Sequence, residues 1–356
     1  MSKYWSEIAK KIDPYVPGEQ PQDKKYIKLN TNENPYPPSP KVIEAIKKAA
    51  NEDLRLYPDP ECDKLREAIA QRSGLKKEQV FVGNGSDEVL AFSYMAFFDP
   101  GCMASKPILF PDITYSFYPV YSKLFGIDYV PVPLDEEFNI PVEAFLKDNG
   151  GIIISNPKAP TAKFMALEEI ERILKNNMEQ VVIIDEAYID FGGESAVCLI
   201  DKYPNLLVIQ TLSKSRCLAG LRIGFALGNE ELIEGINRIK NSVNSYTVDR
   251  LALVGAIEAI KDEKYFKEVT QKVINTRETT ILRLKEIGFS VIDSKANFVF
   301  ISHPSVKAEI IYYRLKEKGI LVRYFKKPRI DNYLRVSIGT DEEMESFIKA
   351  IKEIID

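Results

Sequence analysis

Histidine is almost absent from this chain of 356 residues, which contains only His303. That residue stands in Ser-His-Pro-Ser, a composition typical of a turn. A Ser-His-Asp or Cys-His catalytic group, or a metal site rich in histidine, would have to be built around this one side chain. We therefore expect no metal site, and we expect protons to be transferred at neutral pH by another group. A lysine that works with a cofactor is the obvious candidate.

Cysteine is also scarce, and the cysteines that are present are far apart. No Cys-x-x-Cys pair occurs, so neither a zinc site nor a thiol redox motif is indicated. The sequence predicts reduced, structural cysteines at all four positions, which are Cys62, Cys102, Cys198 and Cys217.

Long apolar runs and basic blocks are missing as well. No run approaches the roughly 20 residues that a membrane-spanning helix needs. The segment from Met1 to Tyr15 alternates charges and has no apolar core of the kind found in secretory signals. The formal net charge is -4, and basic residues are not clustered with aromatic ones. We expect a cytoplasmic protein with no membrane or nucleic-acid partner.

Apolar runs alternate with helical patterns from about Lys41 to Ile260. This alternation is typical of an α/β fold in which helices cover a largely parallel sheet. Helices are predicted at Glu61–Arg72, Ser86–Phe97, Tyr115–Phe125 and Leu167–Asn176. Strands are predicted at Val80–Val82, Pro107–Phe110, Tyr129–Val132, Gly151–Ser155, Val181–Ile184, Leu206–Ile209 and Ile223–Leu227.

The two ends of the chain differ from this central region. Residues 17–40 contain six prolines and little periodicity, which predicts an extended segment that joins two domains or reaches a partner. We expect an arm at residues 1–40, a large domain at 41–262 and a smaller α/β domain at 263–356. The small domain should contain helices at Glu263–Ile287, at Ala308–Lys318 and from Asp341, with strands at Ser290–Ile292, Phe298–Ile301, Leu321–Tyr324 and Tyr333–Ser337.

Lys214 is the residue most suggestive of chemistry. It follows the apolar strand predicted at Leu206–Ile209 and is surrounded by small, polar and glycine residues. A lysine that is desolvated there can lose its proton near neutral pH and act as a nucleophile or base. The alternative is a lysine at a strand end whose ammonium group remains in water.

Two further apolar strands also end in polar residues. Asp185 ends one strand, and Gly85 and Ser86 form a turn into a helix after another. Ligands of open α/β sheets bind at the carboxyl ends of the strands, and a helix N-terminus suits a phosphate. Additional donors to the same anion would come from Thr211, Ser213 and Arg222. Taken singly, Asp185 could be a strand-end cap, Ser86 a helix cap and Arg222 a member of a surface ion pair.

Taken together, these segments resemble the fold-type-I, class-II pyridoxal-phosphate aminotransferases, and most closely the histidinol-phosphate aminotransferase family. The resemblance covers nearly the whole chain, and the order and spacing of the motifs are more specific than any single one. The matching segments are Asp13–Gly18, Leu29–Pro35, Tyr57–Asp59, Gly83–Glu88, Asp185–Tyr188, Thr211–Gly224, Ala296–Phe298 and Leu334–Gly339.

The resemblance implies pyridoxal 5'-phosphate as the cofactor and assigns three catalytic residues. Lys214 would form the Schiff base with the cofactor aldehyde and carry the proton between substrate and cofactor. Asp185 would keep the pyridine nitrogen protonated, which the ring needs in order to store electrons. Tyr188 would donate a hydrogen bond to the phenolic oxygen. Tyr115 would stack on the ring, although it could equally belong to an aromatic helix face that points into the core.

The resemblance also assigns residues to cofactor and substrate binding. The cofactor phosphate would be held by Gly85, Ser86, Asp87, Thr211, Ser213 and Arg222, and by Tyr57 from the other subunit of a homodimer. Tyr57 could instead be ordinary surface. Asn156 would also bind the cofactor. Arg335 would clamp the carboxylate or phosphate of the substrate, with Arg323 as the second anion contact. Further substrate contacts are expected from Asn32, Asn244 and Tyr57.

Two segments depart from the pattern of the family. The loop usually written Asn-Pro-Asn-Asn-Pro-Thr-Gly is here Asn156-Pro-Lys-Ala-Pro-Thr-Ala162. Ala159 has no side-chain donor for the phenolic oxygen, so Tyr188 would donate to that oxygen without the second hydrogen bond that the asparagine of the family's loop supplies. Lys158 is expected to add a charge near the cofactor, and Ala162 narrows the backbone freedom that glycine has. Asn241–Asn244 replaces a more usual Pro-Tyr/Phe-x-x, which bears on substrate choice.

The reaction expected is transfer of an amino group from L-glutamate to imidazole-acetol phosphate, reversibly with L-histidinol phosphate and 2-oxoglutarate. One alternative keeps the reaction and takes aromatic amino acids as substrates. Another is decarboxylation of threonine phosphate, which differs in the bond that is aligned with the ring. A third is a cofactor-binding regulatory protein without turnover: the absence of an appended DNA-binding segment argues against it, whereas the altered loop from Lys158 to Ala162 favours it.

Overall fold

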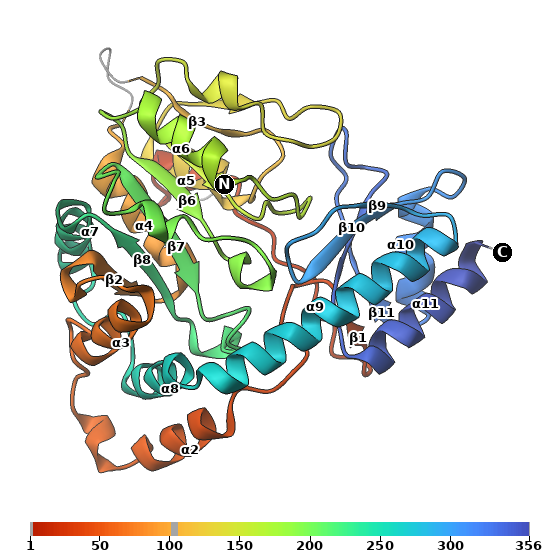
Figure 1. Ribbon diagram of the computed structural model, residues 1–356, viewed down its shortest axis with the longest axis horizontal. Coiled ribbons are helices and arrows are strands. Elements are labelled where there is room, and N and C mark those ends of the chain that lie inside the picture. Colours follow the sequence, from red (N-terminus) through yellow and green to blue (C-terminus); the bar gives the residue numbers. More distant parts are fainter. Residues whose placement is uncertain (1–2, 101–105, 356) are drawn as a thin grey trace.

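A computed structural model describes residues 3–100 and 106–355 of the chain. It has a larger lobe around a mixed sheet and a smaller lobe at the C-terminal end, and one long helix runs between them (Figure 1). The sheet of the larger lobe has seven strands: β2 (Val80–Gly83), β3 (Ile108–Pro111), β4 (Tyr129–Val132), β5 (Ile152–Ser155), β6 (Val182–Asp185), β7 (Leu206–Thr211) and β8 (Gly224–Gly228).

The strands lie in the order β2-β8-β7-β6-β5-β3-β4, and every strand predicted for this region is confirmed. From β7 to β4 all neighbours are parallel, whereas β8 is antiparallel to both β7 and β2. Four central runs, in β3, β5, β6 and β7, are buried along their whole length. Such continuous apolar runs are expected of strands that are covered on both faces.

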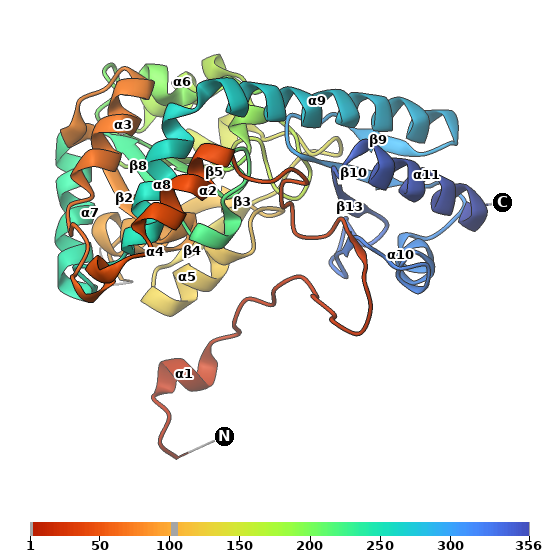
Figure 2. The same ribbon diagram turned by 90° about the horizontal axis from the view of Figure 1, so that it is seen from below.

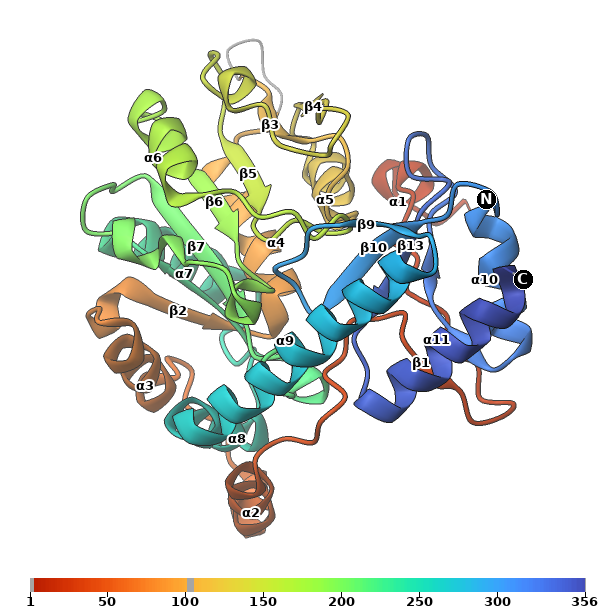
Figure 3. The same ribbon diagram turned by 45° about the vertical axis from the view of Figure 1, so that its right-hand side comes forward.

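Helices cover both faces of this sheet, as the predicted three-layer architecture requires (Figure 3). On one face, Val182 and Val208 belong to a core that contains residues of α3 (Asp63–Ser73), α6 (Leu167–Asn176) and α8 (Arg250–Lys261), with α2 (Pro40–Ala49) outside α8. On the other, Ile183 and Leu207 belong to a core with α4 (Gly85–Phe97), α5 (Phe117–Phe125) and α7 (Glu230–Val243). The alternation along each strand places its neighbours in opposite cores.

The smaller lobe has its own sheet and its own core. Its four strands run antiparallel in the order β12-β13-β10-β9. The strand predicted at Leu321–Tyr324 is divided between two sheets, because β11 pairs with the arm and β12 with β13. The elements are α9 (Glu263–Glu286), β9 (Ser290–Ile292), β10 (Phe298–Ser302), α10 (Ala308–Glu317), β11 (Ile320–Leu321), β12 (Arg323–Tyr324), β13 (Leu334–Ser337) and α11 (Asp341–Ile355).

The N-terminal arm contacts both lobes: Tyr15 stacks on Phe117 of α5 in the larger lobe, and later residues run along the smaller lobe. A short helix, α1 (Glu7–Lys11), stands away from the rest of the chain (Figure 2). Next, β1 (Ile27–Lys28) pairs in parallel with β11, and the chain continues to α2. The segment from residue 17 to 40 is largely without helix or strand, as its prolines predict.

Cys62, Cys198 and Cys217 are free, and Cys102 lies outside the described residues. Within the described part of the chain, no helix combines the length and the apolar character needed to cross a membrane.

Candidate active site

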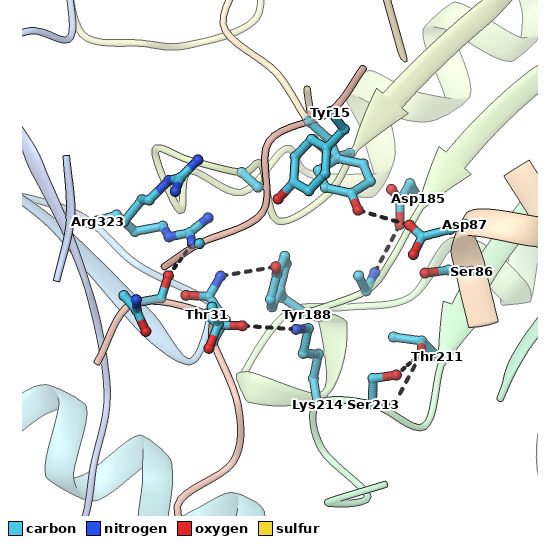
Figure 4. Close-up of a pocket in the computed structure, with 18 of the residues that line it drawn as sticks. Tyr15, Thr31, Ser86, Asp87, Asp185, Tyr188, Thr211, Ser213, Lys214 and Arg323 are labelled. Carbon is cyan, nitrogen blue, oxygen red and sulfur yellow. Dashed lines mark hydrogen bonds between the residues drawn. The ribbon is translucent and has the colours of Figure 1, made fainter. Parts of the chain in front are cut away.

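A pocket opens at the carboxyl ends of the parallel strands, where the larger lobe meets the arm and the smaller lobe (Figure 4). Side chains from β5, β6 and β7 and from the start of α4 line one wall. The opposite wall comes from the arm and from strands β12 and β13. Parallel strands present their carboxyl ends at one edge, which is why motifs far apart in the sequence meet here.

Lys214 reaches this pocket from the turn after β7. Its Nζ donates to the carbonyl of Thr31 at 3.3 Å, and Asn34 donates to the carbonyl of Lys214 at 3.0 Å. No carboxylate lies within ion-pair distance of Nζ among the described residues. Burial, reinforced by the positive charge of Arg335, lowers the pKa of Lys214 to about 8. A substantial fraction of this amine is therefore neutral near physiological pH, as a nucleophile requires.

Asp185 occupies the floor of the pocket at the end of β6. Tyr118 donates to its Oδ2 at 2.8 Å, and the backbone N–H of Ala187 donates to Oδ1 at 3.3 Å. Burial raises the pKa of Asp185 to about 6, although the hydrogen bond from Tyr118 opposes the shift. A carboxylate in this setting is stabilised by any cationic group placed beside it.

The turn between β2 and α4 has the form of an anion cradle. Asn84 precedes the helix, but its side chain donates to the carbonyl of Thr247 and does not cap the first turn. Ser86 lies inside the helix, so it is not the helix cap. Gly85 has φ +82°, and a Cβ there would lie 2.5 Å from Arg222 Nη2; a Cβ on Gly224 would lie 2.2 Å from the nitrogen of Ser86. Only glycines allow this close approach.

Arg222 and two hydroxyl groups complete the cradle. Arg222 forms an ion pair with Asp87 at 3.2 Å, and its Nη1 lies 3.5 Å from Ser213 Oγ. Thr211 Oγ1 donates to the carbonyl of Ile223 at 3.0 Å and lies 3.0 Å from Ser213 Oγ. Arg222 is thus both a partner of Asp87 and a lining residue of the pocket.

Tyr115 also lines the pocket, and its hydroxyl donates to Asp87 Oδ1 at 2.8 Å. The predicted helix begins at Phe117, two residues later than expected, so Tyr115 belongs to the turn before α5. The neighbouring Tyr118 is the one that is fully buried in the core.

Tyr188 connects the large domain with the arm. Asn32 Nδ2 donates to Tyr188 Oη at 3.0 Å, and Asn32 has φ +56°. Asn32 is held in turn by Ser337, which accepts from its backbone N–H and donates to its Oδ1. Asn297 adds a hydrogen bond to the Asn32 carbonyl. Contacts from β13 and the turn before β10 therefore fix the arm residue that donates to Tyr188.

The two arginines expected to bind substrate both line the pocket. Arg335 donates from Nη2 to the carbonyl of Asn30 at 2.9 Å, and its buried Nε has no partner in the described part of the chain. Arg323 contacts the carbonyls of Val16 and Pro17 at 3.3 and 3.4 Å. Both guanidinium groups lie 5.6 Å from the ring centre of Phe325.

The donor set fits a pyridoxal phosphate with an anionic substrate. Four basic side chains but only two acidic ones line the pocket: Lys214, Arg222, Arg323 and Arg335 against Asp87 and Asp185. Ser155 Oγ and Arg335 Nε are buried at its wall and have no hydrogen-bond partner among the described residues. Buried polar groups are normally hydrogen-bonded, so these two atoms indicate a polar ligand.

Several expected residues lie outside the pocket of their own chain. The side chain of Asn156 accepts from the backbone N–H of Met165 and donates to its carbonyl, so neither end of the amide faces the cavity. Tyr57 is 78% exposed and stacks on Tyr246 at 4.6 Å. Asn244 is exposed at the end of α7.

Lys158 differs from its expected position. It is almost completely buried, and its Nζ donates to the carbonyl of Phe138 and not into the pocket. Burial lowers the pKa of Lys158 to about 7. The expectation of an added charge beside the cofactor is therefore wrong: the Lys158 side chain is held at the Phe138 carbonyl, while the next residue, Ala159, lines the pocket.

The pocket also contains seven residues that were not predicted as site residues: Tyr15, Gly18, Asn30, Thr31, Ser155, Ala159 and Ala187. Tyr118, the partner of Asp185, was assigned only to an aromatic helix face. Tyr15 and Thr31 stand in the motifs that carried the resemblance, which is the signal that could have identified them. Nothing in the sequence around Tyr118 distinguishes it from Tyr121, because both lie on the buried face of α5.

Comparisons with known proteins agree with this geometry. The model of the aminotransferase family of classes I and II matches residues 24–351. The chain belongs to this family.

The chain is also 63% identical over 356 residues to a histidinol-phosphate aminotransferase of Clostridium botulinum, covering 100% of this chain and 99% of that one. A protein of the same name from Clostridium acetobutylicum is 62% identical over 355 residues, with 100% of both chains covered. The predicted membership in the histidinol-phosphate aminotransferase family is confirmed.

Solved structures of aminotransferases share the fold. Histidinol-phosphate aminotransferase from Sinorhizobium meliloti, in complex with pyridoxal-5'-phosphate, has a TM-score of 0.88 at 25% identity over 100% of this chain and 98% of that chain. Another solved structure, of a histidinol-phosphate aminotransferase from Clostridium acetobutylicum that is 27% identical to this chain, has a TM-score of 0.84 over 92% of this chain and 98% of that chain. The predicted fold-type-I architecture is confirmed.

Proposed function

We propose that the protein is a pyridoxal-phosphate-dependent aminotransferase that interconverts L-histidinol phosphate and 2-oxoglutarate with imidazole-acetol phosphate and L-glutamate. The observation that carries the proposal is the pocket itself, which combines a partly neutral lysine, a buried carboxylate and four basic side chains. The full-length similarity to histidinol-phosphate aminotransferases supports the choice of substrates.

The cofactor would be held between the strand ends and the start of α4. Its phosphate suits the uncapped N–H groups at Gly85 and Ser86, the hydroxyls of Thr211 and Ser213, and Arg222. Asp185 would pair with the pyridine nitrogen, and Tyr188 would donate to the phenolic oxygen. When bound, pyridoxal phosphate supplies a ring that stores the electron pair left at the substrate alpha carbon.

Lys214 is the group that moves the proton. Its neutral Nζ would take the proton from the alpha carbon of the substrate and later release it as a general acid. The Thr31 carbonyl accepts from Nζ and Asn34 holds the backbone of Lys214, so the arm positions this lysine. Tyr115, which lines the pocket and is held by its hydrogen bond to Asp87, would stack on the ring.

Arg335 and Arg323 would recognise the anionic end of the substrate. Arg335 has a free Nε and can present two N–H groups to a carboxylate or phosphate. Arg323 lies on the neighbouring strand and adds a second positive charge. The substrates differ in the type of anion but both anions are negatively charged, so one pair of arginines can serve both half-reactions.

Absorbance spectroscopy tests this function. The purified protein, loaded with pyridoxal phosphate, should convert its cofactor to pyridoxamine phosphate with L-glutamate and with L-histidinol phosphate. Failure of both donors would disprove the proposal. Conversion by tyrosine or phenylalanine but not by histidinol phosphate would instead identify an aromatic aminotransferase, and release of carbon dioxide from threonine phosphate would identify a lyase.

A homodimer with shared active sites also remains a proposal, as do the division into arm (1–40), large domain (41–262) and small domain (263–356) and a cytoplasmic location. Support for the dimer comes from a set of apolar side chains that are exposed near α2, α7 and the loop after α2: Ile43, Leu54, Leu56, Tyr57, Val243 and Tyr246. Tyr57 would then contact the cofactor phosphate of the other subunit. Sedimentation analysis should find a dimer. The variant Tyr57→Ala should bind the cofactor more weakly but should remain a dimer.

A further inference from the structure

The two arginines of the substrate wall are connected by a single loop. Arg323 lies on β12 and Arg335 on β13, which pair side by side, and residues 325–333 join the two strands. Any contact that fixes this loop also fixes the two guanidinium groups relative to Lys214 and Asp185. Arg329, near the tip of the loop, makes such a contact.

Arg329 reaches from the small domain to two segments of the large domain. Its Nη1 donates to Asp112 Oδ2 at 3.0 Å, and its Nη2 donates to the carbonyls of Leu134 and Asp135, both at 2.8 Å. Asp112 follows β3 and precedes the turn that carries Tyr115. One side chain therefore joins the loop between the arginines to the two segments that flank β4.

The backbone of Arg329 is strained. Its φ is +69°, in the left-handed region that is unfavourable for residues other than glycine. The side chain is 39% exposed, so burial of apolar surface does not explain why an arginine is placed there. Residues are held in such conformations when their surroundings determine them, and these residues cluster at functional sites.

The segment that accepts from Arg329 is itself held firmly. Asp135 Oδ1 accepts from the backbone N–H groups of Glu137 and Asn139 at 2.9 and 2.7 Å. The buried Lys158 donates to the carbonyl of Phe138, which has φ +63°. Residues 134–139 are thus tied to the loop that places Ala159 in the pocket, and they give Arg329 a rigid anchor.

Apolar contacts seal the same junction. Phe138 packs edge-on against Phe300 and Tyr333 at 6.0 and 5.3 Å, and Ile330, next to Arg329, is buried in this cluster. These contacts are non-directional and permit sliding, whereas the three hydrogen bonds of Arg329 specify one register.

We propose that Arg329 is a positioning residue: by fastening the 325–333 loop to Asp112 and residues 134–135, it sets the position of Arg323 and Arg335 for anionic substrates. The inference rests on the proposed role of these two arginines. It predicts that Arg329 affects the binding of substrate anions and leaves the cofactor phosphate, which is held by the opposite wall, unaffected.

The test compares Arg329→Ala with a matched control, Arg283→Ala. Arg283 also belongs to the smaller lobe and forms an exposed ion pair, with Glu345, but has no contact with the large domain among the described residues. The ligand is glutarate, which carries both carboxylates of 2-oxoglutarate but no oxo group and so cannot react. Its affinity for the cofactor-loaded protein is measured by calorimetry, together with cofactor affinity and with KM and kcat for L-histidinol phosphate.

Arg329→Ala should weaken glutarate binding and raise KM roughly tenfold, with kcat and cofactor affinity unchanged, because the lost contact acts equally on bound substrate and transition state. Arg283→Ala should change none of these quantities. Arg329→Lys should recover part of the loss, since an ammonium can pair with Asp112 but cannot donate in the same forked geometry.

A change in glutarate affinity below twofold in Arg329→Ala would overturn the inference. An equal loss of cofactor affinity would also overturn it, because that pattern indicates general loss of structure. If the wild-type protein binds glutarate but does not turn over L-histidinol phosphate, the proposed reaction fails while the glutarate comparison still decides the role of Arg329. A wild-type protein that binds no glutarate would refute both.

Discussion

The wall of the pocket that the large domain supplies differs from the wall supplied by the arm and the small domain. Asp185 ends one strand of the sheet, and Lys214 and Ser86 each follow another, so the sheet alone brings them together. Asn32 and Arg335, in contrast, are placed by contacts between segments about 300 residues apart, such as the hydrogen bonds between Asn32 and Ser337. The position of the proposed catalytic residues thus depends on one sheet. The position of the proposed substrate-binding residues depends on how the arm, the larger lobe and the smaller lobe assemble.

Removing the amine from the large-domain wall should have the largest effect. Lys214→Ala should lower kcat by roughly a thousandfold or more, because no other amine in the pocket can transfer the proton. Cofactor binding should persist through the phosphate cradle. Steady-state assays with L-glutamate and equilibrium dialysis of the cofactor measure the two effects. Lys163→Ala, a change in a lysine outside the pocket, is the control; activity within tenfold of wild type in Lys214→Ala would contradict the assignment.

Changing the carboxylate of the same wall should act on the cofactor. Asp185→Asn should weaken cofactor binding roughly a hundredfold, since an amide cannot compensate a protonated ring nitrogen. The folded-state pKa of Asp185 is raised to about 6, so the carboxylate loses its charge as the pH falls through that value. Cofactor affinity of the wild type should therefore fall below pH 6. Fluorescence titration of the cofactor between pH 5 and 8 measures this affinity. An equally steep fall in Asp185→Asn would show that Asp185 does not cause the pH dependence.

A change in the wall supplied by the arm and the small domain should alter KM. Arg335→Lys should raise KM for both L-histidinol phosphate and 2-oxoglutarate by roughly tenfold to thirtyfold, because lysine cannot form the paired hydrogen bonds of a guanidinium. Cofactor affinity should not change. Initial-rate kinetics with each substrate in turn provides the measurement; a rise confined to one substrate would show that the two anions are bound at different places.

The smallest effect is expected outside both walls, at the second buried lysine. The pKa of Lys158 in the folded state is lowered to about 7, below the value of an unfolded chain, so above pH 7 the unfolded chain binds more protons. The free energy of unfolding of the wild type should therefore rise between pH 7 and 8 by about 1 kcal/mol relative to Lys158→Met. Urea unfolding at the two pH values measures the difference. Identical pH dependence in both proteins would show that Lys158 does not titrate in this range.

The sequence predicted the large-domain wall better than the other wall. The strands that precede Asp185 and Lys214 are uninterrupted apolar runs, and their ends could be located to within two residues. Lys158 was misplaced because alternate residues of a loop can face opposite sides, and no periodicity reveals which side faces the ligand. Tyr118 was missed because its hydroxyl is directed by the packing of α5 on the sheet.

By itself, the sequence determined the order of strands and helices, the location of the lysine, the carboxylate and the glycine turn, and membership in the family, because these depend on local patterns and on spacing. Only the tertiary structure decided which polar atoms meet across the pocket. Asn32 touches Tyr188, Lys158 binds the Phe138 carbonyl and Arg329 ties the small domain to the large one, and each contact joins segments whose separation in the sequence carries no information about their distance in space.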